Sequence, residues 1–177
     1  MSDTPSAPYS MLAVLIGLGF VYFQLLPLQI PAGSAVMPDL LVVLLMAWTI
    51  RRPATLPLLL VAGLLLVADL ALDRPMGLWA LLSLLMIEFL RGQRPAIVGR
   101  PFPVEWLTVA VVYAVALIVF ALILGLTLVG QPEPGRMLQH YAVTMAAYPL
   151  VAALLHWVVR VRPPQAKDAP NRLGRVP

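Results

Sequence analysis

Residues 104–129 read VEWLTVAVVYAVALIVFALILGLTLV, and this stretch decides the fold class. A helix needs about 20 mostly apolar residues to cross the hydrocarbon core of a bilayer. The run exceeds that length and predicts a membrane-spanning helix. The composition agrees, because 61% of the 177 residues are hydrophobic and only 11% are charged, whereas soluble domains carry about a quarter charged residues. We therefore expect an all-α integral membrane protein.

Five further apolar runs complete the pattern, at residues 10–28, 37–50, 54–72, 76–90 and 138–159. Together the six runs predict a domain of six transmembrane helices over residues 1–159. Residues 160–177 are basic, rich in proline and too polar to fold alone, so they predict a cytoplasmic tail. The first ten residues contain Asp3 and lack the basic leader of a cleaved signal peptide. We expect the first helix to be retained.

The charge distribution supports six crossings. The runs at 37–50 and 76–90 are short, at roughly 21–23 Å of helix, and runs of that length are often re-entrant. Six crossings with the N-terminus inside nevertheless leave only two basic residues outside, whereas ten lie inside, as the positive-inside rule requires. The inner ten are Arg51, Arg52, Arg91, Arg94, Arg100, Arg160, Arg162, Lys167, Arg172 and Arg175, and the outer two are Arg74 and Arg136. We interpret the net charge of +4 as a topology signal and expect no nucleic-acid partner.

The sequence offers no catalytic constellation. The chain has no cysteine, which excludes disulfides and thiolate metal sites. It contains no zinc-protease, nucleophile-elbow or P-loop motif. His140 and His156 lie at opposite ends of the last predicted helix, and Glu88 has Arg91 three residues later as an ordinary helical ion pair. We expect a protein that is not an enzyme and binds no cofactor or metal.

Three acids on the predicted outer side are the main candidates for functional residues, because ionisable groups in membrane segments are often functional. Asp39 follows Pro38 and is explained by a helix start, with Pro at the first helical position and an acid favoured by the helix dipole. Asp69 and Asp73 oppose the dipole at the end of a helix, and Arg74 could neutralise Asp73. Their D-x-x-x-D spacing resembles magnesium–pyrophosphate sites, but a second Asp-rich motif is missing.

Residues 37–53, MPDLLVVLLMAWTIRRP, and 58–85, LLLVAGLLLVADLALDRPMGLWALLSLL, resemble the rod shape-determining protein MreD family. That family pairs a Pro-Asp-Leu start and a basic turn with a later Gly, an Asp six residues on, and a Gly-Leu-x-x-Leu continuation. The matching positions here are Pro38, Asp39, Leu40, Arg51, Arg52, Pro53, Gly63, Asp69, Gly77, Leu78 and Leu81. The likeness is closest over residues 37–82, and the six-helix layout extends it over most of the chain.

The resemblance implies a fold like the six-helix substrate-binding component of energy-coupling-factor transporters. It also implies a non-enzymatic subunit of the cell-wall elongation machinery in the bacterial cytoplasmic membrane, which maintains rod shape. Such a subunit bridges the bitopic protein MreC and the peptidoglycan synthases, RodA and its transpeptidase, and links them indirectly to the actin-like MreB filament. The candidate structural or partner-binding residues are Pro38, Asp39, Arg51, Arg52, Gly63, Asp69, Asp73 and Gly77.

One alternative function stays open at this stage, a small-molecule-binding subunit of an energy-coupling-factor type transporter. Its support is the architectural likeness, the outer acids, and the small-residue pair of Ala13 and Gly17, which could dock on a coupling protein. Asp39 and Asp69 would serve packing or a partner-facing groove in the first hypothesis and a ligand pocket in the second.

Overall fold

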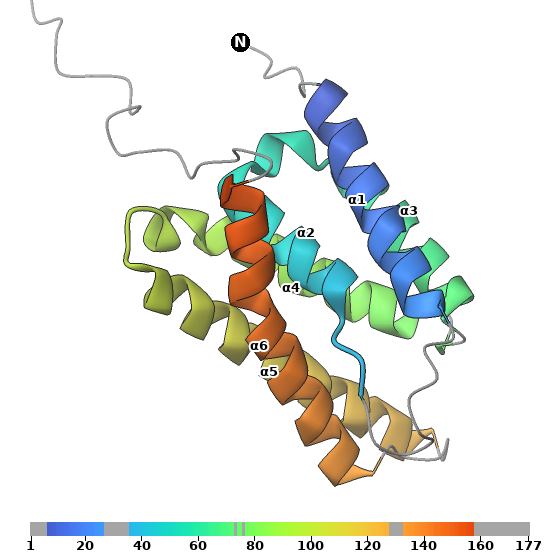
Figure 1. Ribbon diagram of the computed structural model, residues 1–177. Coiled ribbons are helices and arrows are strands. Elements are labelled where there is room, and N and C mark those ends of the chain that lie inside the picture. Colours follow the sequence, from blue (N-terminus) through green and yellow to red (C-terminus); the bar gives the residue numbers. More distant parts are fainter. Residues whose placement is uncertain (1–6, 27–35, 73, 76, 128–132, 158–177) are drawn as a thin grey trace, which may run out of the picture.

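The computed structural model describes residues 7–26, 36–72, 74–75, 77–127 and 133–157. Over these residues the chain forms six α-helices and one short 3₁₀ turn (Figure 1). They are α1 (Ala7–Leu25), α2 (Leu40–Arg51), η1 (Pro53–Thr55), α3 (Leu58–Ala71), α4 (Leu78–Ile97), α5 (Phe102–Leu126) and α6 (Pro134–Trp157). The expected all-α architecture is confirmed. The predicted tail at 160–177 lies outside the described residues.

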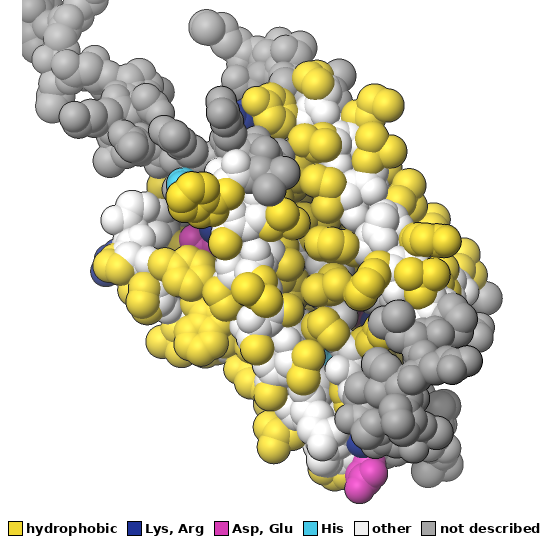
Figure 2. Space-filling view, in the orientation of Figure 1, with side chains coloured by type: hydrophobic (Ala, Val, Ile, Leu, Met, Phe, Trp, Pro, Cys, Tyr) yellow, Lys and Arg dark blue, Asp and Glu magenta, His cyan; other side chains and the backbone are white. Residues whose placement is uncertain are grey.

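Three of the helices, α1, α5 and α6, are long and apolar enough to cross a membrane. Helices α2 and α3 are apolar but shorter, and α4 carries Glu88, Arg91 and Arg94 in its second half. Hydrophobic side chains also cover the face formed by α1 and α6 (Figure 2), and Leu59, Leu126 and Leu150 are 86%, 84% and 73% exposed. Soluble monomers rarely expose apolar surface on this scale, so the structure indicates a membrane location.

The centre of the fold is α2, whose residues 41–51 are all buried. Helices α1, α4 and α6 pack against α2, and α3 packs on α1 and α4 (Figure 1). With 12 residues, α2 is only about 18 Å long, well short of the roughly 30 Å hydrocarbon core. Because other helices shield α2 on all sides, the length of this helix is set by its protein neighbours rather than by lipid.

Successive helices run in alternating directions, so the molecule has two ends. At the first, which we call the Arg51 end, Ser10 Oγ donates to the Thr55 carbonyl at 2.6 Å and Arg94 Nε donates to the Ile50 carbonyl at 3.0 Å. At the second, the Asp39 end, Gln24 Nε2 donates to the Pro38 carbonyl at 3.2 Å. The described arginines divide unequally by their contacts. Those toward the Arg51 end are Arg51, Arg52, Arg91, Arg94 and Arg100, and those toward the Asp39 end are Arg74 and Arg136.

Several helices begin or end a few residues away from the predicted spans, for reasons rooted in backbone chemistry. Helix α2 starts at Leu40 instead of residue 37, because Asp39 is its N-cap. Helix α3 starts at Leu58 instead of residue 54, since Pro53 and Pro57 confine the preceding residues to a 3₁₀ turn and an extended cap. Helix α4 continues to Ile97, beyond the apolar run that ends at residue 90, because polar residues extend the helix as readily as apolar ones.

The small-residue pair on α1 is used inside the fold. Ala13 is 1% exposed. A Cβ atom at Gly17 would lie 2.7 Å from Leu64 Cδ2 and 3.2 Å from Leu41 Cδ1. The missing side chain therefore lets α1 approach α2 and α3 closely, as small residues do in membrane helices. The expectation that Ala13 and Gly17 form an external docking surface is wrong for this reason.

Candidate functional site

Asp39 organises a buried polar cluster where α2 begins. Its Oδ1 accepts a hydrogen bond from the Val42 amide at 3.4 Å, the N-cap interaction expected at a helix start. Its Oδ2 accepts from Arg74 Nη1 at 2.9 Å and from Trp79 Nε1 at 2.7 Å. The side chain is 1% exposed, so the arginine compensates a charge held away from solvent. Pro38 was predicted to stand at the first helical position, but it precedes the N-cap and lies outside the helix.

Helices α5 and α6 are tied to the same helix start. The Asp39 amide donates to Thr144 Oγ1 at 3.2 Å. His140 Nδ1 lies 3.0 Å from the Met37 carbonyl, which can only accept, so Nδ1 carries the hydrogen. In the neutral imidazole Nε2 then accepts from the Tyr113 hydroxyl at 3.0 Å. Four helices thus meet in one hydrogen-bonded junction at the Asp39 end.

Asp69 belongs to α3, but its carboxylate contacts the start of α4. It lies at the end of α3, where a carboxylate opposes the dipole, but its Oδ2 accepts from the Ala80 amide at 2.9 Å in the first turn of α4. The N-cap residue of α4 is Gly77, which has no side chain to supply and adopts a left-handed φ of 78°. Asp69 therefore provides from α3 the capping carboxylate that α4 lacks, at the positive end of its dipole.

The structure gives Arg74 a carboxylate partner that the sequence did not predict. Arg74 pairs with Asp39, whereas its predicted partner, Asp73, lies outside the described residues. Within the described part of the chain, no group of three or more His, Asp or Glu side chains could hold a metal ion. The predicted Glu88–Arg91 pair is confirmed, at 3.2 Å. The carboxylates of Asp39 and Asp69 each accept from a helix amide, which is a structural use of their charge.

A second buried polar cluster lies at the Arg51 end and was not predicted. Arg51 Nη1 contacts Glu105 Oε1 at 2.8 Å, and the Tyr148 hydroxyl donates to the same oxygen at 2.6 Å. Arg51 also donates to the Ala47 carbonyl at 2.9 Å. Because Arg51 and Glu105 have side chains only 6% and 14% exposed, this cluster joins α2, α5 and α6 through a mostly desolvated ion pair.

Two further arginines donate hydrogen bonds to backbone carbonyls at and just beyond the C-terminus of α2. Arg94 donates to the Ile50 carbonyl at 3.0 Å, and Arg91 Nη2 donates to the Leu56 carbonyl, just past η1, at 2.7 Å. Cations near the last carbonyls of a helix satisfy unpaired acceptors and favour the dipole. Arg52 takes another role and covers the Tyr9 ring of α1, with its guanidinium carbon 4.2 Å from the ring centre.

The eight candidate residues thus divide between different places. The structure gathers Pro38, Asp39, Asp69 and Gly77 at the Asp39 end, and it places Arg51 and Arg52 at the opposite end. Gly63 belongs to neither cluster: it lies on the exposed face of α3, and an added Cβ would have no neighbour within 4 Å.

Sequence reasoning missed Trp79, Thr144 and His140 as members of the Asp39 cluster. It also missed Glu105 and Tyr148 at the Arg51 end. Trp79 and Glu105 carried a usable signal, since each places a polar group in the first turn of an apolar helix.

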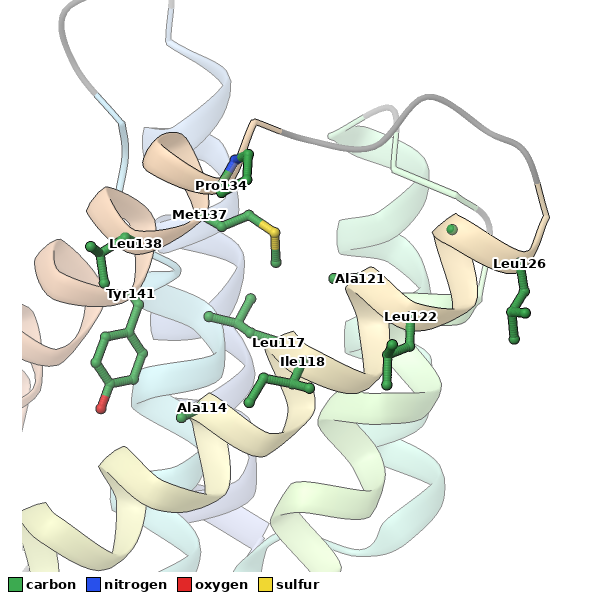
Figure 3. Close-up of a pocket in the computed structure, with 11 residues that line it drawn as sticks. Ala114, Leu117, Ile118, Ala121, Leu122, Leu126, Pro134, Met137, Leu138 and Tyr141 are labelled. Atoms are coloured by element: carbon green, nitrogen blue, oxygen red, sulfur yellow. The ribbon is translucent and has the colours of Figure 1, made fainter.

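Two adjoining cavities lie beside α5 and α6 near the Asp39 end. A groove of about 930 Å³ runs between α5 and α6, and its lining side chains are apolar apart from the hydroxyl of Tyr141 (Figure 3). A smaller pocket of about 260 Å³ adjoins it and shares Leu117 and Met137 with it. That pocket is lined by Arg74, Trp79 and His140, together with Arg136. The smaller pocket is therefore lined by several polar side chains, and it lies on the side of the molecule that the sequence predicts to face outward.

No family model, curated protein or solved structure matches this chain. The class of protein therefore follows from the fold and the site alone: an all-α chain with several candidate membrane-spanning helices, locked at both ends of a buried central helix by polar clusters.

Proposed function

We propose that this chain is a six-span, non-enzymatic membrane subunit of the bacterial cell-wall elongation machinery, of the kind the MreD resemblance implies. The observation that carries the proposal is the convergence of Asp39, Asp69 and Gly77. These three residues, which carry the resemblance, form two interlocked helix starts at one end of the fold. The proposed location is the bacterial cytoplasmic membrane with both termini inside.

A scaffold role accords with how the polar groups are used. Asp39 satisfies an amide, an arginine and an indole, and Asp69 satisfies the first turn of α4. Such contacts hold helices in register and leave the apolar exterior as the surface for lipid and partner helices. The proposed partners are an MreC-like bitopic protein and the synthase complex of RodA and its transpeptidase, with MreB reached indirectly.

The unequal distribution of arginines supports the orientation. Five of the seven described arginines lie at the Arg51 end. The positive-inside rule assigns that end to the cytoplasm. In this proposal α2, α3 and α4 complete the six crossings beside α1, α5 and α6. Helix α2 can be short because it is buried among other helices and has no lipid thickness to match.

The test is co-purification of the tagged chain with its MreC-like partner, together with rod-shape rescue of cells depleted of the endogenous protein. Asp69→Ala leaves the Ala80 amide buried without its acceptor and should destabilise the junction by about 0.5–2 kcal/mol, weakening association and rescue. Asp69→Asn keeps an acceptor oxygen and should retain most of both. Glu133→Ala, an exposed acid at the same end, is the control.

The proposal fails if the wild-type chain neither rescues rod shape nor co-purifies with the bitopic protein. If instead Asp69→Ala behaves like Glu133→Ala in both assays, the proposed role of the Asp69 cap in association is wrong.

One observation favours the transporter alternative. The pocket beside Arg74, Trp79 and His140 could admit a small polar ligand from the outer side, with a volume of about 260 Å³. The burial of Ala13 and Gly17 removes the coupling surface on which this alternative relied. Saturable binding of a labelled vitamin-type ligand by the purified protein would favour the transporter function over the scaffold.

A further inference from the structure

The turn between α4 and α5 borders a groove on the lateral surface of the Arg51 end. The chain reverses over four residues, 98–101, in which Gly99 has a left-handed φ of 88°. The groove between the end of α4 and the start of α5 has a volume of about 510 Å³. It is separate from the α5–α6 groove of Figure 3 and shares no lining residue with it.

The polarity of this groove changes along its length. Arg100, in the turn, and Gln93, in the last part of α4, are both exposed and lie at the end of the molecule. Farther from the turn the lining becomes apolar, with Phe89, Leu107 and Val111 exposed by 52%, 61% and 55%. Thr108 adds no polarity, because its hydroxyl donates to the Val104 carbonyl. The groove thus offers a polar head region and a hydrocarbon region in the order of an amphiphile in a bilayer.

The described charge at the Arg51 end is positive overall, and Arg100 is the cation that lines the groove itself. Among the described residues, Arg51 pairs with Glu105 and Arg91 with Glu88. Arg52, Arg94 and Arg100 form no ion pair within the described part of the chain. Three guanidinium groups at this end therefore lack a carboxylate partner there. The α5–α6 groove differs, since no charged side chain lines it.

We propose that the α4–α5 groove is a binding site for an anionic phospholipid of the cytoplasmic leaflet. Its phosphate lies at Arg100 and Gln93, and one acyl chain lies along Phe89, Leu107 and Val111. Juxtamembrane basic groups attract the anionic lipids of that leaflet, and the apolar lining selects a lipid over a soluble anion. The proposal shares the membrane orientation of the proposed function but requires none of its protein partners.

The test uses the full-length chain purified in a mild detergent and mixed with equal amounts of phosphatidylglycerol and phosphatidylcholine of the same acyl chains. Native mass spectrometry measures the ratio of the two lipids retained. The wild type should prefer phosphatidylglycerol. Arg100→Gln should reduce the preference about fivefold, the equivalent of about 1 kcal/mol per arginine near a membrane surface, and Arg100→Lys should keep it. Arg136→Gln, which removes an exposed arginine at the other end, is the matched control.

A second variant tests the hydrocarbon region without touching charge. Val111→Trp should fill the groove and reduce retention of both lipids, and thermal unfolding shows whether each variant is folded. Equal retention of the two lipids by the wild type would overturn the proposal, as would equal losses in Arg100→Gln and Arg136→Gln. Both results are independent of co-purification with an MreC-like protein, so this proposal and the proposed function can fail separately.

Discussion

Asp69 and Gly77 divide one task between two helices. Gly77 supplies the left-handed backbone from which α4 begins, and Asp69 supplies the acceptor that a glycine lacks. Neither residue is explained by its own neighbours in the sequence. An acid at a helix C-terminus opposes the helix dipole, and a glycine before a helix offers no side chain to cap it. Together they fix the position of the start of α4 against the end of α3.

Replacing Gly77 by alanine should destabilise the protein by about 1–2 kcal/mol, since an L-residue is strained at positive φ. Space is not the reason, because the nearest atom to an added Cβ is Leu66 Cδ2 at 4.0 Å. The control is Gly92→Ala, inside α4 with no neighbour within 4 Å, which should stabilise by about 0.5–1 kcal/mol. Unfolding in mixed micelles measures both, and equal effects of the two substitutions would contradict the strain argument.

The Arg51 cluster predicts an ordered series of losses. Glu105→Gln leaves a buried guanidinium uncompensated and should cost about 3–5 kcal/mol. Tyr148→Phe removes one hydrogen bond to a charged group and should cost about 1.5–3 kcal/mol. The double substitution Arg51→Met with Glu105→Met should recover much of the first loss, because hydrophobic replacement of a whole buried pair is often neutral.

The free energy of unfolding in mixed micelles reports the series, with the exposed Glu133→Gln as the reference for loss of a carboxylate. A Glu105→Gln variant as stable as Glu133→Gln would show that the pair contributes nothing.

At the scale of elements, α6 contains a proline that removes one backbone hydrogen bond, and a side chain of α5 supplies a replacement donor. Pro149 has no amide hydrogen, so the Met145 carbonyl one turn earlier has no intrahelical donor. Trp106 of α5 donates its indole N–H to that carbonyl at 3.1 Å. This bond links two of the long apolar helices by a contact that neither helix could make with lipid.

A double-mutant cycle tests this link. Trp106→Phe should destabilise the wild type by about 1 kcal/mol, because it leaves the carbonyl unsatisfied. In a Pro149→Ala background, where residue 149 regains its N–H, the same substitution should cost clearly less. Thermal unfolding of the four proteins gives the coupling energy. A coupling energy of zero would show that the indole bond does not compensate for the proline.

The whole molecule makes a topology prediction that a cysteine-free chain can test simply. Single cysteines at Arg100 and at Glu133, both exposed, should behave oppositely in intact cells. A membrane-impermeant maleimide should label Glu133→Cys directly and Arg100→Cys only after permeabilisation. Direct labelling of Arg100→Cys would reverse the orientation and with it the leaflet proposed for the lipid.

The sequence predicted the parts of this molecule that depend on neighbouring residues. Apolar runs located the helices, and the contact between Glu88 and Arg91 follows from helical spacing. The missed contacts join distant segments: Glu105 is 54 residues from Arg51, and Thr144 is 105 residues from Asp39. Such pairs depend on how helices pack, and a run of Leu, Ala and Val gives no unique packing. The contact of Arg74 with Asp39, 35 residues away, was missed for the same reason.

The complete enclosure of α2 has a consequence for biosynthesis. Helix α2 is made before α4, α5 and α6, yet its burial requires α6, the last of the described helices, which also supplies Thr144 to the amide of Asp39. Until then α2 is a short segment ending in an arginine, a poor candidate for stable insertion alone. The nascent chain must therefore keep α2 beside α1 and α4 until α6 has been made, and a chain that stops before α6 would leave the core around α2 incomplete.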